Sequence, residues 1–330
     1  MKTATVTTWV PSTRATSTYL IRAYFIYGDC DGENSLPEFN LYIGATRWET
    51  LSLPNATFSS YEETIFVATM NFISICLVNT GSGIPFISGL ELRPLSNSMY
   101  GAANESQSLL TWGTFDIGRS IYKVNIRYPE DPFDLIWQPT EDASWISFGA
   151  SQNVTIKDKA IEPPTTVMMT TVRPANNSDA LYLNWTTRDF SAQFHVYMHF
   201  AELELLGPNM KREFAICCGN NSCYSSPIRP EYFVTTTIQT PQPLSGQQNY
   251  TCSFTKTPNS NLPPILNTIE MFTILQLPET PTREEDGMNL SSAGLKGKID
   301  ASLANLKSIQ SFDPVNLVDN LKEIQTEKRT

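Results

Sequence analysis

The strongest constraint on how this chain folds is an internal repeat. Three apolar segments of the first half return in the same order in the second half, at almost one offset. The matched pairs are Tyr19–Tyr27 with Phe194–Glu202, Pro37–Gly44 with Arg212–Gly219, and Pro85–Leu92 with Pro264–Met271. Ordered matches of this length predict a tandem duplication of a whole domain.

The first copy is shorter than the second at its start. Tyr19 lies close to the beginning of the chain, whereas a long stretch of sequence precedes Phe194 within its own half. The sequence therefore predicts two domains, the first of them N-terminally incomplete. Two domains also suit a length of 330 residues.

Short apolar segments separated by Gly, Pro, Asn and Asp predict strands joined by turns. The segment Leu20–Tyr27 is apolar or aromatic on both faces, which is typical of a strand inside a sandwich. The predicted fold class is mainly β, with two tandem β-sandwiches of jelly-roll type.

The end of the chain differs from the rest. Leucine and isoleucine between Leu290 and Phe312 follow the spacing of a single leucine-rich repeat, and a charged amphipathic segment follows it. The predicted organisation is domain 1 at 1–95, a linker at 96–110, domain 2 at 111–277, a linker at 278–287, the repeat at 288–313 and a polar helical tail at 314–330.

Charge and patterning limit the partners and the compartment. A net charge of −10 argues against nucleic acid, which requires clustered Lys and Arg. These residues contain neither a signal-peptide core nor an apolar run long enough to span a membrane. Asn-x-Ser/Thr acceptors exceed the chance number and indicate an extracellular history. They are Asn55, Asn104, Asn153, Asn176, Asn184, Asn220, Asn249 and Asn289.

Four cysteines cluster in the second copy: Cys217, Cys218, Cys223 and Cys252. Adjacent cysteines rarely ligate one zinc ion and no histidine lies nearby, so a disulfide among the four, with Cys252 as one partner, is favoured over zinc. Cys76 lies in an apolar strand, where it is either a small buried hydrophobe or the partner of a cysteine in the missing segment.

Several residue pairs have the residue types of catalytic or metal-binding groups. Asp29 with Asp31 fits a turn better than the paired carboxylates of a glycosidase, which come from different segments. His195 and His199 lie about 13 Å apart along a strand and cannot share an ion. No G-x-S-x-G setting or phosphate-binding glycine loop occurs. We expect a non-enzyme without cofactor or metal.

Several motifs together resemble one family over residues 19–312. They include Tyr19-Leu-Ile-Arg22, Tyr27-Gly-Asp-Cys-Asp-Gly32, Leu36-Pro-Glu-Phe39, Arg127-Tyr-Pro-Glu-Asp-Pro-Phe-Asp134, Ile136-Trp-Gln138 and His199-Phe-Ala-Glu202. The chain resembles the malectin-like extracellular region of plant leucine-rich-repeat receptor kinases. That resemblance implies two malectin-like sandwiches, leucine-rich repeats, a membrane helix and a kinase. The kinase motifs do not occur in these residues, so phosphotransfer is not carried over.

The resemblance also implies a binding function at the plasma membrane, on its extracellular side. Malectin contacts a glucose disaccharide through loop aromatics and an acidic residue, because sugar CH faces stack on rings and sugar hydroxyls pair with carboxylates. Candidate ligand residues at matching places are Tyr24, Tyr27, Asp29, Asp31 and Trp48. Other family members bind peptides or co-receptor proteins, with the cleft between the two sandwiches as a second candidate place.

Three functions stay open from sequence. The first is a receptor ectodomain fragment that binds a cell-wall glycan or a peptide. The second is a structural or decoy protein that pairs with intact receptors. The third is a truncated gene product without independent activity. Glycan binding, pull-down of a receptor and mapping of the transcript ends would separate them.

Overall fold

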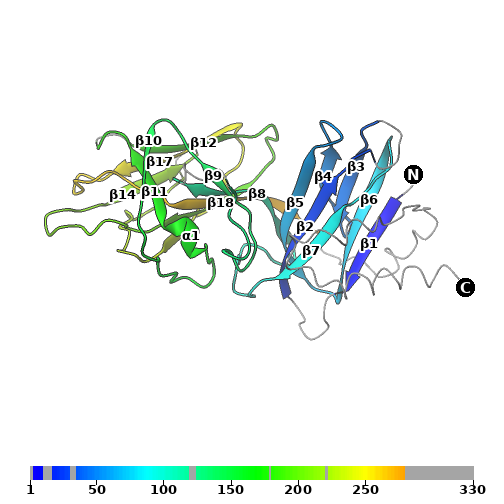
Figure 1. Cartoon of the computed structure of the whole chain (residues 1–330), viewed down its shortest axis with the longest axis horizontal. Helices are drawn as coiled ribbons and strands as arrows, with labels where there is room; N and C mark the ends of the chain where they lie inside the picture. The colour runs from blue at the N-terminus through cyan, green and yellow to red at the C-terminus, as the bar shows by residue number, and fades with distance from the viewer. Residues whose placement is uncertain are drawn as a thin grey trace, which may run out of the picture. The chain divides into compact units, whose positions relative to one another are not determined.

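A computed structural model describes residues 3–9, 17–29, 35–118, 124–177, 180–219 and 222–278 (Figure 1). The predicted repeat at 288–313 and the tail at 314–330 lie outside the described residues. The only helix among the described residues, α1 (Thr165–Met168), is 4 residues long, so none of these helices could cross a membrane. The mainly β fold expected from the sequence is confirmed.

The first sandwich has two facing layers (Figure 1). One layer is a four-stranded sheet in the order β1 (Thr3–Trp9), β6 (Phe72–Ser82), β3 (Glu38–Ile43), β4 (Thr46–Ser52). The other contains β5 (Ser59–Ala68), β2 (Ser17–Ile26) and β7 (Gly89–Pro94). Alternate residues of β2, among them Ile21, Ala23 and Phe25, point into the core between the layers. A period of two is what a strand with one face on a core requires.

The second sandwich repeats this strand order. Its four-stranded sheet runs β12 (Leu181–Thr186), β17 (Asn249–Lys256), β14 (Phe214–Cys218), β15 (Ser222–Cys223). Its other layer contains β16 (Thr236–Gln239), β13 (Phe194–Phe200) and β18 (Thr268–Gln276). A separate two-stranded sheet pairs β10 (Trp145–Gly149) with β11 (Thr170–Pro174).

The registers match as well as the orders. Arg22 lies opposite Glu91 between β2 and β7, and Tyr197 lies opposite Glu270 between β13 and β18. The repeated segments place these two pairs at equivalent positions. Equal order and equal register favour the duplication that the sequence predicts.

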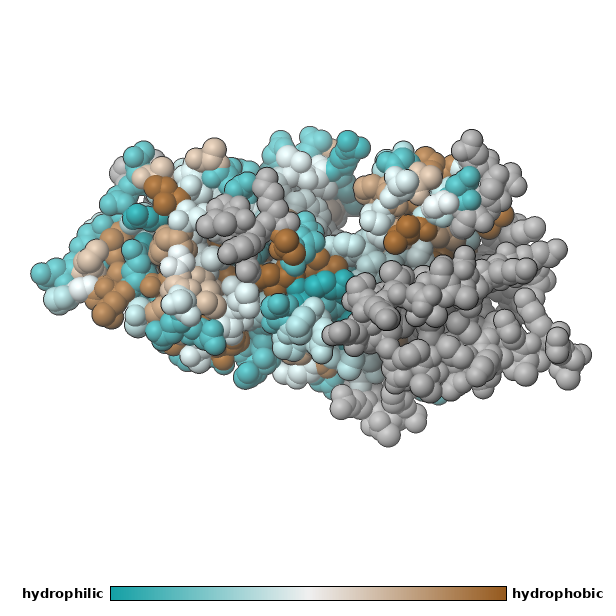
Figure 2. Space-filling model, in the orientation of Figure 1, coloured by the Kyte–Doolittle hydropathy of each residue, from teal (hydrophilic) through white to brown (hydrophobic). Residues whose placement is uncertain are grey.

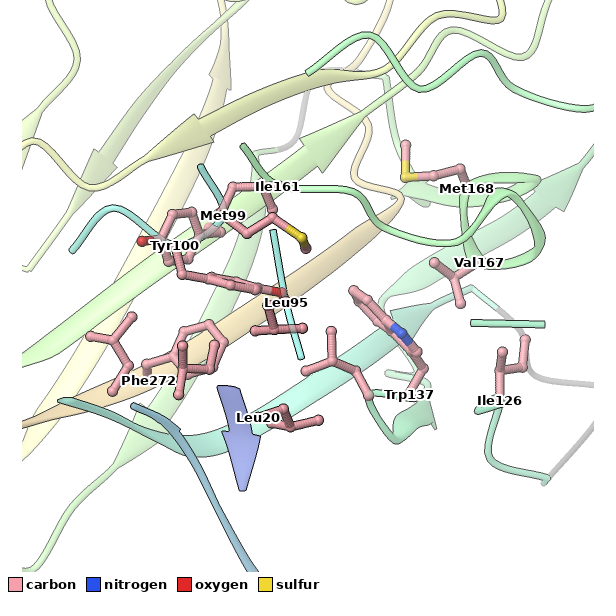
Figure 3. Packing of buried hydrophobic residues seen from close by; sticks show 14 of the residues in the cluster. Leu20, Leu95, Met99, Tyr100, Ile126, Trp137, Ile161, Val167, Met168 and Phe272 are labelled. Carbon is pink, nitrogen blue, oxygen red and sulfur yellow. The ribbon is translucent and has the colours of Figure 1, made fainter. Parts of the chain in front are cut away.

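One sheet runs through both sandwiches. Strand β8 (Gln107–Ile117) pairs with β5 on one side and β18 on the other, and β9 (Trp137–Thr140) pairs with β8 in parallel. A third apolar cluster covers the face of this central sheet that points away from the two sandwich cores. It combines Leu20 of β2 and Phe272 of β18 with Met99, Tyr100 and Trp137 (Figure 3). The central sheet is therefore buried on both faces, which explains its strands without polar alternation.

The segment 96–110 differs from the polar linker expected from the sequence. Met99 and Tyr100 are each 1% exposed, and β8 already begins at Gln107. The segment is mostly polar, so its few apolar side chains gave no strand pattern, yet they fill part of the third cluster. The two sandwiches are consequently joined by a shared sheet and a shared core.

The four clustered cysteines form two disulfides rather than the single one expected. Cys217 bonds Cys223 on β15, and Cys218 bonds Cys252 on β17. Neighbouring residues of a strand point to opposite faces, so the adjacent cysteines of β14 reach different strands. Cys218 and Cys252 are buried in the second sandwich core, whereas Cys223 is exposed.

The two disulfides should differ in their contribution to stability. Loop-closure entropy grows with the logarithm of loop length, and the bonded cysteines are 34 residues apart in one case and 6 in the other. Replacing Cys218 and Cys252 by alanine should therefore cost about 1.5 kcal/mol more than replacing Cys217 and Cys223. Urea unfolding of both double variants measures the difference, and equal losses would contradict the expectation.

Candidate functional site

A cleft opens in the central sheet where the two sandwiches meet. Strands β5 and β8 pair only through Thr64 with Leu110 and Ile65 with Leu109. Next to these pairs lies a cavity of about 240 Å³. It is lined by Tyr61, Glu62 and Glu63 of β5, by Thr111, Trp112, Gly113 and Thr114 of β8, and by Ile136 and Gln138.

An irregularity in β8 lies beside this cleft, at the lining residue Trp112. The register between β8 and β18 shifts at Trp112, between the pairs Phe272–Thr111 and Met271–Gly113. Such a bulge re-aims a side chain. The Trp112 ring packs edge-on against Phe194 at 6.1 Å between centroids, yet 42% of the residue stays exposed.

The residue after this tryptophan, Gly113, leaves room for a neighbouring ring. A Cβ at Gly113 would overlap the ring of Phe115, which lies across the strand there. The ring of Phe115 also contacts Trp112, with 5.9 Å between centroids. Gly113 thus lets the two rings pack together at the cleft wall.

Behind the opposite wall lies a buried ion network, here called the Arg22 network. It consists of Arg22, Glu63, Glu91, Arg93, Arg127 and Asp134. Arg22 Nε donates to Glu63 Oε1 at 2.6 Å, and its Nη1 donates to Asp134 Oδ2 at 2.9 Å and Glu91 Oε2 at 3.1 Å. Its Nη2 also donates to the main-chain oxygen of Asp134. Three guanidinium groups balance three carboxylates, as buried charges require.

The network sets the ionisation of its carboxylates. Burial alone would raise the pKa of Asp134, but hydrogen bonds from Arg127 and Tyr128 N and the charge of Arg22 lower it to about 2. Burial keeps the pKa of Glu63 above its ordinary value although Arg22 opposes the shift. Asp134 is therefore a fixed anion that holds Arg22 in place.

Glu62, the neighbour of Glu63, has a different environment. It is half-buried, and its carboxylate has no hydrogen-bond or ion-pair partner in the described part of the chain. Burial, together with the carboxylates of Glu49 and Glu63, raises the pKa of Glu62 to about 7. The cleft thus carries one carboxylate whose charge is not compensated.

The second sandwich has its own buried polar cluster. His199 Nε2 lies 3.1 Å from Glu270 Oε1, and His199 Nδ1 lies 3.0 Å from Thr237 Oγ1. The Tyr100 hydroxyl donates to Glu270 Oε2 at 2.6 Å. All three ionisable side chains are buried, so this cluster fixes the segment around Tyr100 to β18 and offers no access to a substrate.

Most of the ligand residues expected from the sequence do not meet at one surface. Tyr27 and Trp48 are 2% and 4% exposed in the first sandwich, a placement that favours a core role for both. Asp29 lies in a turn with φ 52°, where its carboxylate accepts from the Tyr27 hydroxyl at 3.3 Å. Asp31 lies outside the described residues. Tyr24 lies on the other face of β2, with its ring 6.1 Å from that of Tyr61 at the cleft.

Six of the eight predicted glycosylation acceptors lie in the described part of the chain, and all six are exposed. They are Asn55, Asn104, Asn153, Asn176, Asn184 and Asn249; Asn220 and Asn289 lie outside it. Within the same residues no group of three or more His, Cys, Asp and Glu side chains is arranged to hold a metal ion.

Apolar surface does not single out another site on the face shown in Figure 2. Hydrophobic residues occur there in several separate patches between hydrophilic areas (Figure 2). Scattered apolar residues are ordinary on a protein surface. The cleft combines an exposed ring, a cavity and an uncompensated charge, and is the candidate site.

Comparison with known structures defines the class of fold. The fold matches the ectodomain of ANX2 from Arabidopsis thaliana with a TM-score of 0.66, at 16% identity, over 83% of this chain and 82% of that one. It also matches a structure of the plant peptide RALF23 in complex with FER and LLG2, with a TM-score of 0.60, at 18% identity, over 83% and 81% of the chains. The fold is that of malectin-like receptor kinase ectodomains.

The sequence comparisons place the chain in a family. The malectin-like domain profile matches residues 8–274, and the chain belongs to the malectin-like domain family. It is 38% identical over 287 residues to the LRR receptor-like serine/threonine-protein kinase IOS1 and 37% identical over 267 residues to the probable kinase MEE39, both of Arabidopsis thaliana. These matches cover 86% and 81% of this chain but 31% and 30% of those proteins.

The sequence reasoning missed Arg22, Asp134, Glu62 and Trp112 as a connected site. A signal existed for Arg22, because a charged residue inside the apolar segment Tyr19–Tyr27 must find a partner when the strand is buried. No comparable signal existed for Trp112, since its exposure depends on a bulge against β18, far away in sequence.

Proposed function

We propose that this chain forms the ligand-sensing extracellular region of a malectin-like receptor kinase and that it binds without catalysing a reaction. The ligand, a cell-wall carbohydrate or a peptide, occupies the cleft between β5 and β8, and a co-receptor protein binds elsewhere on the ectodomain. The exposed acceptor asparagines support an extracellular location at the plasma membrane.

The observation that carries this proposal is the construction of the cleft. Binding sites favour concave places between structural units, with aromatic walls and a few placed polar groups. Trp112, Tyr61 and Glu62 supply such groups, and the buried Arg22 network holds one wall in place. The complex of FER with RALF23 and LLG2 supports a peptide and a partner protein as ligands for this fold.

Loss of the Trp112 ring should weaken ligand binding. We expect Trp112→Ala to lower the affinity for a ligand selected from panels of cell-wall oligosaccharides and secreted peptides at least about tenfold, because a central aromatic carries much of the binding energy of a site. Titration calorimetry on the purified glycoprotein measures the change.

Tyr182→Ala is the matched control. Tyr182 is an exposed aromatic residue of β12 that does not line the cleft, and its loss should leave the affinity unchanged. Equal effects of the two variants would place the ligand outside the cleft. Capture of an intact receptor without any glycan or peptide binding would instead favour a decoy role.

A further inference from the structure

We propose that the cleft takes an arginine side chain of a peptide ligand, stacked on Trp112 and paired with Glu62. This inference rests on the proposed function and names the ligand class for the same site. It follows from three features of the cleft: its charge, its aromatic wall and its size.

The negative charge of the cleft favours a cationic ligand. The charged groups that raise the pKa of Glu62 are the carboxylates of Glu49 on β4 and of Glu63 on its own strand. The lining residues of β8 carry no charge. Glu63 is already paired with Arg22, so Glu62 remains the carboxylate without a counter-charge. A guanidinium group would supply that charge and form two parallel hydrogen bonds with it.

The neighbouring network shows that this chain already binds a guanidinium in the same way. Arg22 is paired with Glu63, and its Cζ lies 5.8 Å from the Tyr24 ring and 6.0 Å from the Tyr61 ring. The cleft offers a second set of these groups, Glu62 and Trp112, of which Trp112 is 42% exposed. Tryptophan is the strongest aromatic partner for a cation.

The size of the cleft suits one side chain. Its volume of about 240 Å³ is smaller than that of most small-molecule sites, about 300–1,000 Å³. The buried Thr111 Oγ1 in its lining has no hydrogen-bond partner among the described residues.

A neutral sugar fits these groups less well. Its hydroxyls could pair with Glu62 and its CH face with Trp112, but the charge of Glu62 beside Glu49 and Glu63 would stay uncompensated. An arginine side chain can stack on Trp112 and neutralise Glu62 at the same time. The observations therefore favour a basic peptide over a glycan.

The test compares two small probes of nearly the same shape, of which one carries a guanidinium charge and the other a neutral urea group with an oxygen in place of one amino group. N-acetyl-L-arginine methylamide and its neutral isostere N-acetyl-L-citrulline methylamide are titrated into the glycoprotein, with saturation-transfer NMR as readout. We expect the arginine probe to bind at least about tenfold more tightly than the citrulline probe. Glu62→Gln should remove that preference, whereas Glu231→Gln, a change at an exposed carboxylate of a remote ion pair, should keep it.

The pH dependence gives a second readout. Because the pKa of Glu62 is about 7 in the free protein, the arginine probe should bind roughly tenfold or more weakly at pH 5.5 than at pH 8. Glu62→Gln should abolish this dependence. A raised carboxyl pKa means that the stability contribution of Glu62 is lost as pH rises through about 7, so the Gln variant should be at least as stable as wild type at pH 8. A loss of arginine binding in Glu62→Gln at pH 8 therefore cannot be attributed to unfolding of the variant.

Three results would overturn the inference: equal affinity for both probes, no change in Glu62→Gln, or no arginine binding at the highest soluble concentration. If maltose binds in their place and Trp112→Ala abolishes that binding, the proposed function stands and the arginine site falls. If Trp112→Ala leaves every selected ligand unaffected, the cleft itself is the wrong site.

Discussion

Replacing Arg22 by methionine should lower the free energy of unfolding by about 3–5 kcal/mol, because it leaves buried carboxylates without their counter-charge. Arg22 is 1% exposed and bonds Glu63 and Asp134, both of which are buried. Methionine keeps much of the side-chain volume, so the loss reports charge rather than packing. Urea unfolding at pH 7, followed by tryptophan fluorescence, measures it.

The matched control is an ion pair at the surface. Lys157 and Glu231 form a 3.1 Å pair whose side chains are 65% and 55% exposed. Exposed pairs contribute about 0–1 kcal/mol, so Lys157→Met should change the free energy of unfolding by less than about 1 kcal/mol. A loss below about 1 kcal/mol in Arg22→Met would show that solvent reaches the network and that it does not fix the cleft wall.

The Arg22 network and the Tyr100–Glu270 hydrogen bond both cross between the sandwiches. Asp134, which follows β8, reaches back to Arg22 on β2. Tyr100, which precedes β8, reaches forward to Glu270 on β18. Each connecting segment is thus bonded to the sandwich from which it is more distant in sequence. Both bonds hold β8 between its neighbours, and the cleft beside β8 is therefore formed before any ligand binds.

Local pattern was sufficient for the central apolar strands of each sandwich, but it did not predict β1 or β4. The apolar segment Tyr19–Tyr27 covers most of β2 and Phe194–Glu202 contains β13, because strands buried on both faces have near-continuous apolar sequences. The repeat also aligns Glu91 with Glu270. In the structure Glu91 lies opposite Arg22, and Glu270 lies opposite Tyr197, at the equivalent position. Order and register within a sandwich depend on short-range alternation, which the sequence carries.

The junction could not be derived in the same way. β8 pairs with β5 of the first sandwich only at Leu109 and Leu110 but with β18 of the second over Gln107–Asp116, and its register shifts at Trp112, so no single alternation describes it. Tyr27 and Trp48 have the residue types of a sugar site, yet packing of the first sandwich buries them. The cleft depends on which strands, distant in sequence, pair with β8. Such pairing is set by the tertiary structure and cannot be read from local sequence patterns.

The third apolar cluster makes the junction a structural core, and Trp137 is its largest fully buried side chain. Its Nε1 donates to Asp131 Oδ2 at 2.7 Å, and Figure 3 shows the ring among the other side chains of the cluster. Trp137→Ala should cost about 3–5 kcal/mol, since the ring leaves a cavity that its neighbours fill only in part. The same change at the exposed Trp112 should cost far less, and equal losses would contradict the assignment.

Trp137→Phe separates the hydrogen bond from the packing. The smaller ring keeps most contacts but leaves Asp131 Oδ2 without a donor, which should cost about 1–3 kcal/mol. Burial raises the pKa of Asp131 to about 6 and the Trp137 hydrogen bond opposes that shift, so the variant should raise this pKa further. The lost bond matters only to the ionised carboxylate, and the destabilisation should therefore be larger at pH 8 than at pH 5. A loss that is equal at both pH values would show that packing alone holds the junction together.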